Sequence, residues 1–337
     1  MLKFDDFGRI MTNDPPTIDG IPIRSESIGF SPAELIACGK CVRSNPPNRL
    51  NCFYCGELLE LPAEIAAGIS FKPVEVDDWE PGVNIIVTDG VARTNAQSIA
   101  SAVAMDGDLA ESVARLVPPF PIFRVRAEEA GEVSARLERL GLAVKRVEDS
   151  SLVPSKPAVR LKGVAFGADS LTFYPFNSEA VVVARTSEVV LIVVGAIVTT
   201  TAESKLKKKR KEMKEFDEHL STSDHSVIDI YTASDETGFR VLPHGFDFSC
   251  LGERKSLIAA ENVKVLSDKL RELIPGAAFD RSYANKLEIL DKVWPRTVAN
   301  TSKGIERNWF GVQRALGSTT TNEDQFTRYS RMRRKLI

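Results

Sequence analysis

The sequence has little that would place it in a membrane. Its most apolar run, Val189 to Val198, spans ten residues, whereas a membrane-spanning helix needs about 20 apolar residues. The first residues, MLKFDDFGRIMTNDPP, carry acidic side chains where a secretory signal peptide needs a basic start and an apolar run. We therefore expect no membrane span and a cytoplasmic location.

A large excess of charge of one sign is also missing. The 337 residues include 44 Lys and Arg against 46 Asp and Glu, so no global charge favours a polyanionic partner. With 43% hydrophobic and 27% charged residues, the composition is that of globular chains that bury a core. This length suits two or three domains.

The familiar motifs of catalysis are absent. No Gly-x-Gly-x-x-Gly follows an expected strand, and there is no nucleophile elbow, His-Glu-x-x-His or EF-hand loop. Gly252 precedes Lys255-Ser256, but two residues intervene where a phosphate-binding loop needs Gly-Lys-Ser/Thr to be adjacent. The sequence declares no reaction, and we expect a binding protein more than an enzyme.

Four of the five cysteines form two Cys-x-x-Cys pairs, Cys38 with Cys41 and Cys52 with Cys55. Two such turns bring four thiolates to one tetrahedral metal site, and four protein ligands leave no position for a reactive water. The pattern predicts one structural Zn²⁺ per chain. A rubredoxin-like iron site and paired disulfides are the alternatives.

The residues around these cysteines support the same interpretation. Gly39 and Gly56 suit the two turns, because glycine accepts the positive φ that points backbone amides at sulfur. Pro46-Pro47-Asn48 fits a hairpin tip between the two pairs. The segment resembles the short zinc ribbons found as N-terminal modules of many bacterial proteins, which bind nucleic acid, bind protein or only fold.

Periodicity predicts a small β-α-α-β-α-β domain after the ribbon. Val83–Val87 is an apolar run typical of a buried strand, and helical spacing follows over 95–105 and 109–117. Another strand over 120–125, a helix over 128–140 and a final strand over 142–147 complete the order, with Gly141 expected to end the last helix.

This order, with the phrase SIASAVAMDGDLAESVARLVPPFPIFRVRAEEAGEVSARLERLGLAVKRV, resembles the C-terminal domain of the bacterial ribosomal stalk protein. The resemblance covers about 65 residues. That family has a lysine-rich first helical region. In this sequence, the corresponding segment from Asn95 to Val117 has one basic residue, Arg115. The resemblance therefore implies the fold alone, and an unrelated split β-α-β fold of ferredoxin type is the alternative.

The pattern changes to strands from Val159 onward. Runs rich in Val, Ile, Phe and Thr suit strands over 160–174, 180–184, 189–200, 226–231 and 238–248. An amphipathic helix over 260–274 follows, with Val263, Leu266, Leu270 and Leu273 on one face. Antiparallel strands with one C-terminal helix resemble the bacterial pleckstrin-homology-like barrel.

The sequence thus predicts an α+β multidomain protein. Its expected parts are an extended lead-in (1–31), the zinc ribbon (32–61), the small α/β domain (82–150), an antiparallel β-rich domain like the pleckstrin-homology fold (158–280) with a charged insertion (204–220), and a linker with a basic tail (281–337).

Two clusters of cations could contact phosphates. Lys205 to Lys211 holds six cations in seven residues, although a solvated loop would have the same composition. From Arg296 to Ile337, nine Lys and Arg stand against three Asp and Glu, a net charge of +6. The last cations, which alternate with Phe326 and Tyr329, are Arg328, Arg331, Arg333, Arg334 and Lys335. This pattern fits either stacking on bases or an amphipathic helix that docks onto a protein.

His244, Asp247 and Cys250 have the residue types of a nucleophilic triad. On one strand, however, His244 and Cys250 would point to one face and Asp247 to the other. We therefore expect Cys250 to be a buried thiol.

Each type of module expected here more often provides a binding surface than a catalytic site. We expect a zinc-binding adaptor or assembly component that contacts a protein partner. The alternatives are a nucleic-acid-associated protein that uses the ribbon and the basic tail, and an enzyme whose site no sequence motif reveals.

Overall fold

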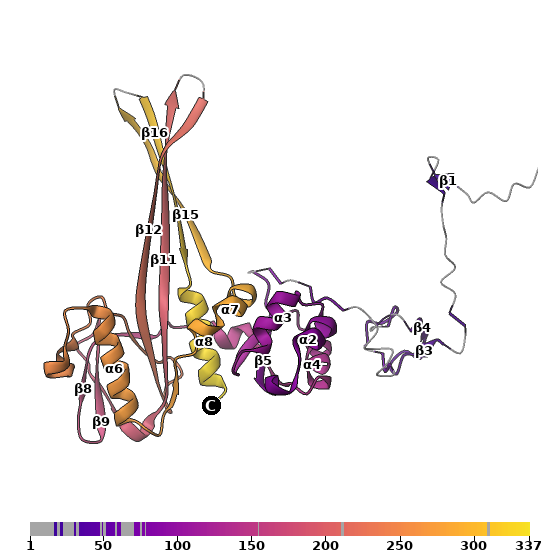
Figure 1. Ribbon diagram of the computed structural model, residues 1–337, viewed down its shortest axis with the longest axis horizontal. Coiled ribbons are helices and arrows are strands. Elements are labelled where there is room, and N and C mark those ends of the chain that lie inside the picture. The colour runs from indigo at the N-terminus through magenta and orange to yellow at the C-terminus, as the bar shows by residue number, and fades with distance from the viewer. Residues whose placement is uncertain are drawn as a thin grey trace, which may run out of the picture. The chain divides into compact units, whose positions relative to one another are not determined.

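The computed structural model describes most of the chain as two compact units, Met1–Ser70 and Phe71–Ile337 (Figure 1). Only the backbone is described at 17–18, 21–22, 204–209, 212–218, 301–308 and 311–316. The described residues are 17–18, 21–22, 30–31, 34–47, 49, 52–57, 59–61, 71–74, 76–77, 79–153, 155–209, 212–308 and 311–337.

The first unit contains two short antiparallel hairpins. β1 (Thr17–Ile18) pairs with β2 (Ile21–Pro22), and β3 (Ile36–Ala37) pairs with β4 (Ser44–Asn45). Most of the expected lead-in lies outside the described residues. The tip of the β3–β4 hairpin is the first cysteine turn, and Pro46-Pro47 follows β4. Asn48 of the expected second tip lies outside the described residues.

The second unit begins with the predicted β-α-α-β-α-β order. The elements are β5 (Val83–Asp89), η1 (Val91–Arg93), α2 (Ala96–Val103), α3 (Gly107–Ala114), β6 (Phe120–Val125), α4 (Ala130–Arg139), β7 (Ala143–Glu148) and α5 (Asp149–Leu152). The three strands form an antiparallel sheet in the order β6-β5-β7. Asn95 and Asp106 cap α2 and α3 with their side chains, and Gly141 follows α4 with φ +83°, as predicted.

A larger sheet follows in the order β10-β9-β8-β13-β12-β11-β16-β15, with β14 beside β11. Its strands are β8 (Val159–Phe166), β9 (Ser170–Pro175), β10 (Val182–Arg185), β11 (Val189–Lys209), β12 (Glu212–Thr232), β13 (Phe239–Val241), β14 (Ala278–Asp280), β15 (Thr297–Asn308) and β16 (Gly311–Thr321). The described strands run from one free edge to the other without closing. The expected pleckstrin-homology-like barrel is therefore not found among the described residues. Instead, β11 and β12 continue outward, where β11 also pairs with β16, and β16 pairs with β15.

The long helix of this region, α6 (Ala259–Leu273), packs on the sheet as predicted. Leu266 and Leu270 are fully buried and belong to a core with β8, β9, β12 and β13. Leu273, which was expected on the same face, is 44% exposed because the helix ends there. The short helices of the second unit are η2 (Thr186–Glu188), η3 (Phe248–Arg254), η4 (Ala284–Lys286) and α7 (Leu287–Val293).

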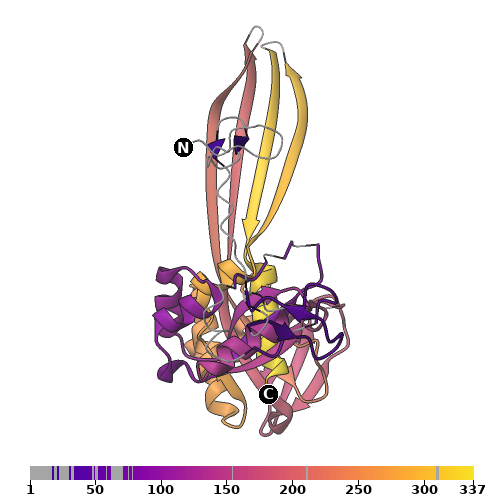
Figure 2. The ribbon, with the colours of Figure 1, turned by 90° about the vertical axis from the view of Figure 1, so that its right-hand side faces the viewer.

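The charged insertion and the expected linker form a four-stranded arm (Figures 1 and 2). Residues 204–220 were expected to be a loop, but 204–209 end β11 and 212–220 begin β12. Residues 281–337 were expected to be a linker with a basic tail, but 297–308 and 311–321 form the β15–β16 hairpin, which pairs with β11 from Thr199 to Lys207. "The arm" denotes 198–209 of β11, 212–226 of β12, β15 and β16. Its four strands are joined by backbone pairing along their length.

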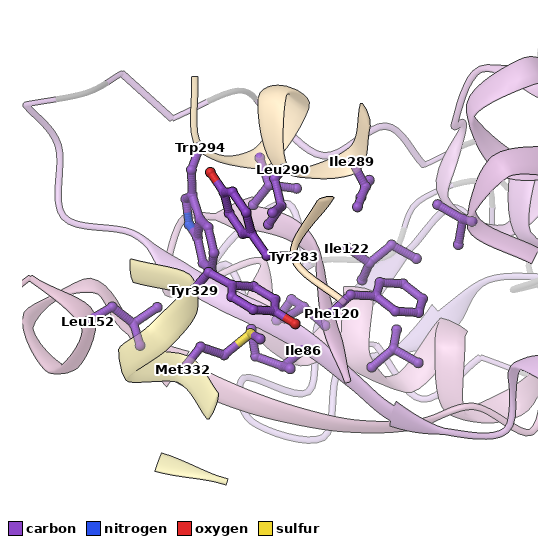
Figure 3. Packing of buried hydrophobic residues seen from close by; sticks show 14 of the residues in the cluster. Ile86, Phe120, Ile122, Leu152, Tyr283, Ile289, Leu290, Trp294, Tyr329 and Met332 are labelled. Atoms are coloured by element: carbon purple, nitrogen blue, oxygen red, sulfur yellow. The ribbon is translucent and has the colours of Figure 1, made fainter. Parts of the chain in front are cut away.

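The basic tail forms α8 (Glu323–Lys335), and its apolar face is part of the core. Phe326, Tyr329 and Met332 are fully buried. Figure 3 shows Tyr329 and Met332 among Ile86 and Phe120 of the α/β part and Tyr283, Leu290 and Trp294 of the segment around α7. The expected amphipathic helix is thus present, but its apolar stripe packs into the core of the same chain and is not left exposed for docking onto another protein.

Candidate metal centre and binding surfaces

The two cysteine turns are built alike. The backbone N–H of Val42 donates to Cys38 O at 2.9 Å, and that of Gly56 donates to Cys52 O at 3.0 Å. Val42 and Gly56 have φ of 61° and 72°. In each turn, the residue with positive φ is the one directly after the second cysteine. Gly39, which was expected to have a positive φ, does not have one.

The four sulfur atoms come together at one point. All of them lie within 4.8 Å of one another. Cys38 Sγ is 3.6 Å from Cys55 Sγ, and Cys41 Sγ is 3.5 Å from Cys52 Sγ. Four sulfurs bound at ~2.3 Å to one tetrahedral ion would be about 3.8 Å apart. The cysteines are free thiols at these distances, so the cluster has the donors and spacing to hold a metal ion.

Polar groups around the cluster favour thiolate at Cys52. Burial works against its charge, but the backbone N–H groups of Tyr54 and Cys55 lower the pKa of Cys52 to about 6. The Tyr54 N–H lies 3.4 Å from Cys52 Sγ, and Asn45 Nδ2 donates to the same sulfur at 3.4 Å. Asn45 is fully buried and also accepts from Phe53 N, so it ties β4 to the second turn. Among the described residues, this is the only group of three or more His, Cys, Asp or Glu side chains placed to share an ion.

Two exposed aromatic side chains beside this cluster were not expected. Phe53 and Tyr54 are between the second pair of cysteines and are both exposed. The Arg49 guanidinium lies 4.8 Å from the Phe53 ring centre, and that of Arg43 lies 4.7 Å from the Tyr54 ring centre. Aromatic rings flanked by arginine are suited to stacking on bases or on protein side chains. The sequence signal for them was the FY dipeptide inside Cys-x-x-Cys.

The arm has no core on either face among its described side chains. From Val198 outward on β11, and from Ser226 to His219 on β12, every described side chain is partly or fully exposed. Hydroxyl groups align across its strands: Thr199 faces Thr321 and Thr201 faces Thr319, with oxygens 3.3 and 3.4 Å apart. Four of the six cations noted at 205–211 are on β11, whereas Arg210 and Lys211 lie outside the described residues.

The cations of α8 are largely engaged within the chain. Arg333 Nε lies 2.6 Å from Asp280 Oδ2, although its N–H does not point at that oxygen, so this contact is an ion pair and not a hydrogen bond. Arg334 donates to the backbone oxygens of Thr232 and Ala233, and Lys335 pairs with Glu236 at 3.0 Å. Arg328 and Arg331 are left half-buried without an ion pair to a described residue.

A buried polar network anchors α8. Lys286 Nζ donates to Ser282 Oγ at 2.7 Å and to the Tyr329 hydroxyl at 3.0 Å, and that hydroxyl donates to Asp280 Oδ2 at 2.7 Å. Burial lowers the pKa of Lys286 to about 8, and burial likewise raises the pKa of Tyr329. Lys286 and Tyr329 are closed off from solvent, so the network is suited to holding η4 and α8 together.

The residue types of a nucleophilic triad are not assembled. Asp247 Oδ1 accepts from Ser249 N and Oγ, and His244 packs edge-on against His225 with ring centres 4.6 Å apart. Cys250 is half-buried instead of buried, and desolvation raises the pKa of its thiol. The thiol is therefore not activated as a nucleophile.

Two cavities lie beside α7. One of about 570 Å³ is lined by the C-terminus of α2, the N-terminus of α3, β6 and α7. The other, of about 360 Å³, lies between the segment after α7 and α8, with Arg296, Asp324 and Arg328 in its wall. Neither cavity is lined by Asp280, Lys286 or Tyr329.

No described helix is both long and apolar enough to cross a membrane. Comparisons with protein-family models, with curated proteins and with solved structures gave no match for this chain.

Proposed function

We propose that this protein is a zinc-binding modular adaptor or assembly component that acts through protein–protein contacts. The observation that carries the proposal is the arm. Ordering long strands costs conformational entropy, and burial of apolar surface normally offsets that cost. The described side chains of the arm bury no core, so a binding role is the simplest reason for its length.

The arm offers the kind of backbone surface that proteins recognise. Beyond Val227, β12 pairs with no described strand except β11, and β15 pairs only with β16. Both strands therefore present unpaired backbone groups, to which an extended segment of a partner can add as a further strand. The hydroxyl rows on the faces supply hydrogen-bonding groups to the same partner.

We propose Zn²⁺ as the metal of the cysteine cluster. Four thiolates at tetrahedral spacing are typical of structural zinc, and such a site fills every coordination position with protein. The ion would hold the two turns of this small unit together, because few apolar side chains besides Leu59 are buried there. We also propose that 82–150 has a stalk-type fold, supported by its β-α-α-β-α-β order in an antiparallel sheet.

Shortening the arm tests the adaptor proposal. Ala202 is the register partner of Leu220, and Asn300 is that of Ser318. Each pair can be joined by Asn-Gly, which favours the two-residue turn of a hairpin. Proteins captured from nuclease-treated native lysate by the full chain, and lost with the shortened chain, are purified and their affinities for both chains measured.

The expected result is direct binding of a purified partner to the full chain, with affinity lost on shortening while the melting temperature is kept. A variant with the arm intact and Leu257→Ser, which removes an exposed side chain on another surface, serves as the control. Equal affinity of every captured partner for full and shortened chains would refute an adaptor role of the arm.

Nucleic-acid association is the second candidate, favoured by the stacked Arg43–Tyr54 and Arg49–Phe53 pairs. It predicts binding to labelled single-stranded RNA that weakens steeply as salt rises. Phe53→Ala with Tyr54→Ala should then abolish the binding while the metal content stays at one ion per chain. Negligible RNA binding by the full chain at every salt concentration would refute this second candidate.

A further inference from the structure

The smaller of the two cavities lies at the base of the arm, where β15 begins beside the first turns of α8. Its volume of about 360 Å³ is at the small end of the range for cavities that hold small molecules. Apolar residues of its wall, such as Pro295 and Val298, lie next to charged ones. The charged residues are Arg124, Arg296, Asp324 and Arg328.

Two of these charges are neutralised within the chain. Arg124 pairs with Asp149 at 2.8 Å and donates to backbone oxygens of the segment before β5. Arg296 donates from Nε and Nη2 to the two carboxylate oxygens of Asp291, at 3.0 and 2.9 Å. Asp291 Oδ1 also accepts from Gln325 Nε2 at 2.8 Å, so the pair is held in place. Arg296 Nη1 donates to no described residue and is left for a ligand.

The other two charges, Asp324 and Arg328, are not paired. They are one turn apart on α8 with the acid nearer the N-terminus, an order that favours an ion pair. Neither forms an ion pair with the other or with any residue in the described part of the chain. Asp324 Oδ2 accepts from the Thr297 hydroxyl at 2.8 Å, which orients the carboxylate and leaves Oδ1 available. Arg328 is half-buried, so its guanidinium loses water without gaining a described partner, and a bound carboxylate would offset that cost.

We propose that this cavity binds a free α-amino acid with an apolar side chain. The ligand's carboxylate accepts from Arg328 and from Arg296 Nη1, and its ammonium group donates to Asp324 Oδ1. The charges of the wall select this chemistry, because Asp324 repels a ligand that is only an anion and the arginines repel a ligand that is only a cation. The apolar side chain lies against Pro295 and Val298. This binding site does not depend on the adaptor function proposed above.

Isothermal titration calorimetry of the full chain with L-leucine and with L-phenylalanine tests the proposal. At least one of the two should bind saturably, with one molecule per chain. The N-acetyl derivative of that amino acid keeps the carboxylate without the ammonium group, and the methyl ester keeps the ammonium group without the carboxylate. Each derivative should bind about tenfold more weakly or worse, because it leaves a charged group of the wall without a partner. No binding of either amino acid, or equal binding of the N-acetyl derivative, would overturn the proposal.

Substitutions in the wall assign each charge of the ligand to its partner. Arg328→Gln should weaken binding of the amino acid and of its N-acetyl derivative, since both bind through a carboxylate. Asp324→Asn should weaken binding of the amino acid alone, a difference that a general loss of structure would not produce. Arg331→Gln removes the same charge at a half-buried position of α8 outside the cavity wall, so it should bind like the wild type. Wild-type affinity of Arg328→Gln, or an equal loss in Arg331→Gln, would overturn the site.

Discussion

Trp294 Nε1 donates a hydrogen bond to Asn84 Oδ1 at 2.7 Å, between two residues that are both buried. Trp294 follows α7, and Asn84 is on β5. The Asn84 amide nitrogen donates in turn to Val147 O and to Asp149 Oδ1, so its orientation is fixed from the other side. The bond links the α/β part to the C-terminal third of the chain inside one shared core.

Trp294→Phe should destabilise the second unit by roughly 1–3 kcal/mol, because it leaves the buried Asn84 oxygen without a donor. Urea unfolding followed by circular dichroism measures the change. Trp79→Phe is the matched control, since Trp79 is 80% exposed, and its effect should stay within about 0.5 kcal/mol. Equal stability of both variants would show that the two parts are not coupled through this bond.

The cysteine cluster predicts one tightly bound zinc ion per chain, measurable by elemental analysis of metal-replete protein. Cys38→Ser should lose the ion and unfold the first unit, while the circular dichroism melt of the second unit persists. The variant Cys250→Ser, which removes the cysteine outside the cluster, should still bind one zinc ion per chain. Iron in place of zinc would contradict the metal assignment, and Cys38→Ser protein with full metal content would contradict the ligand set.

Leu266→Ala and Leu270→Ala should each lower the free energy of unfolding by roughly 2–5 kcal/mol, because both side chains are fully buried between α6 and the large sheet. Leu273→Ala is the same change on the same helix at a largely exposed position. It should cost less than about 1 kcal/mol. Chemical denaturation that gives equal costs at all three positions would show that α6 does not pack as described.

Lys286 predicts a specific pH dependence of stability. Its pKa falls from 10.5 to about 8 through burial, so between these values the unfolded chain binds a proton that the folded chain does not. Stability then rises with pH across that window, by at most about 1.4 kcal/mol per unit. The pKa of Asp280 is lowered by its hydrogen bonds from Ser282 although burial opposes this, so Asp280 keeps its charge there, and Tyr329, whose pKa burial raises, stays protonated in the folded chain.

Lys286→Met removes this group, so the wild type should gain stability relative to the variant from pH 8 to 10 in urea titrations. Taking the difference between the two proteins cancels the contribution of every other titrating group that the substitution leaves unchanged. Lys264→Met, at an exposed site of α6, should give a constant difference over the same range. A constant difference for Lys286→Met as well would mean that Lys286 is not desolvated.

The features that could be predicted from the sequence are those that depend on residues close together in the chain. The spacing of Cys38, Cys41, Cys52 and Cys55 is enough to bring four thiolates together, and apolar periodicity is enough for the β-α-α-β-α-β order. The sequence of the arm is rich in threonine, serine and charged residues, so its strands lack the period-two alternation that marks a half-buried strand. Its register also depends on partners such as Thr199 and Thr321, which are far apart in the chain.

Helix α8 shows a different limit. The apolar stripe of Phe326, Tyr329 and Met332 was visible in the sequence, and so was its helical spacing. Periodicity says that a stripe must be covered, but it does not say whether the cover is another protein or the same chain. The exposed Val182 and Val183 of β10 could not be distinguished from a core strand for the same reason.

Gly195 of β11 gives the sharpest test of how α8 packs. A methyl group at this position would lie 2.7 Å from Phe326 Cδ2 and 3.0 Å from Tyr283 Cδ1. Gly195→Ala should therefore destabilise the protein by roughly 1–3 kcal/mol through overpacking. Gly276→Ala, where no atom lies within 4 Å of the new methyl group, is the matched control and should be close to neutral.

Phe326→Leu reshapes the side chain that meets the new methyl group, and alone it should be destabilising because it leaves space in the core. Combined with Gly195→Ala, the two costs should not add: the double variant should be more stable than their sum by at least about 0.5 kcal/mol. The coupling is measured as a double-mutant cycle from urea unfolding. Strict additivity would mean that the Phe326 ring does not rest on Gly195, and that α8 is held on the sheet by its other contacts alone.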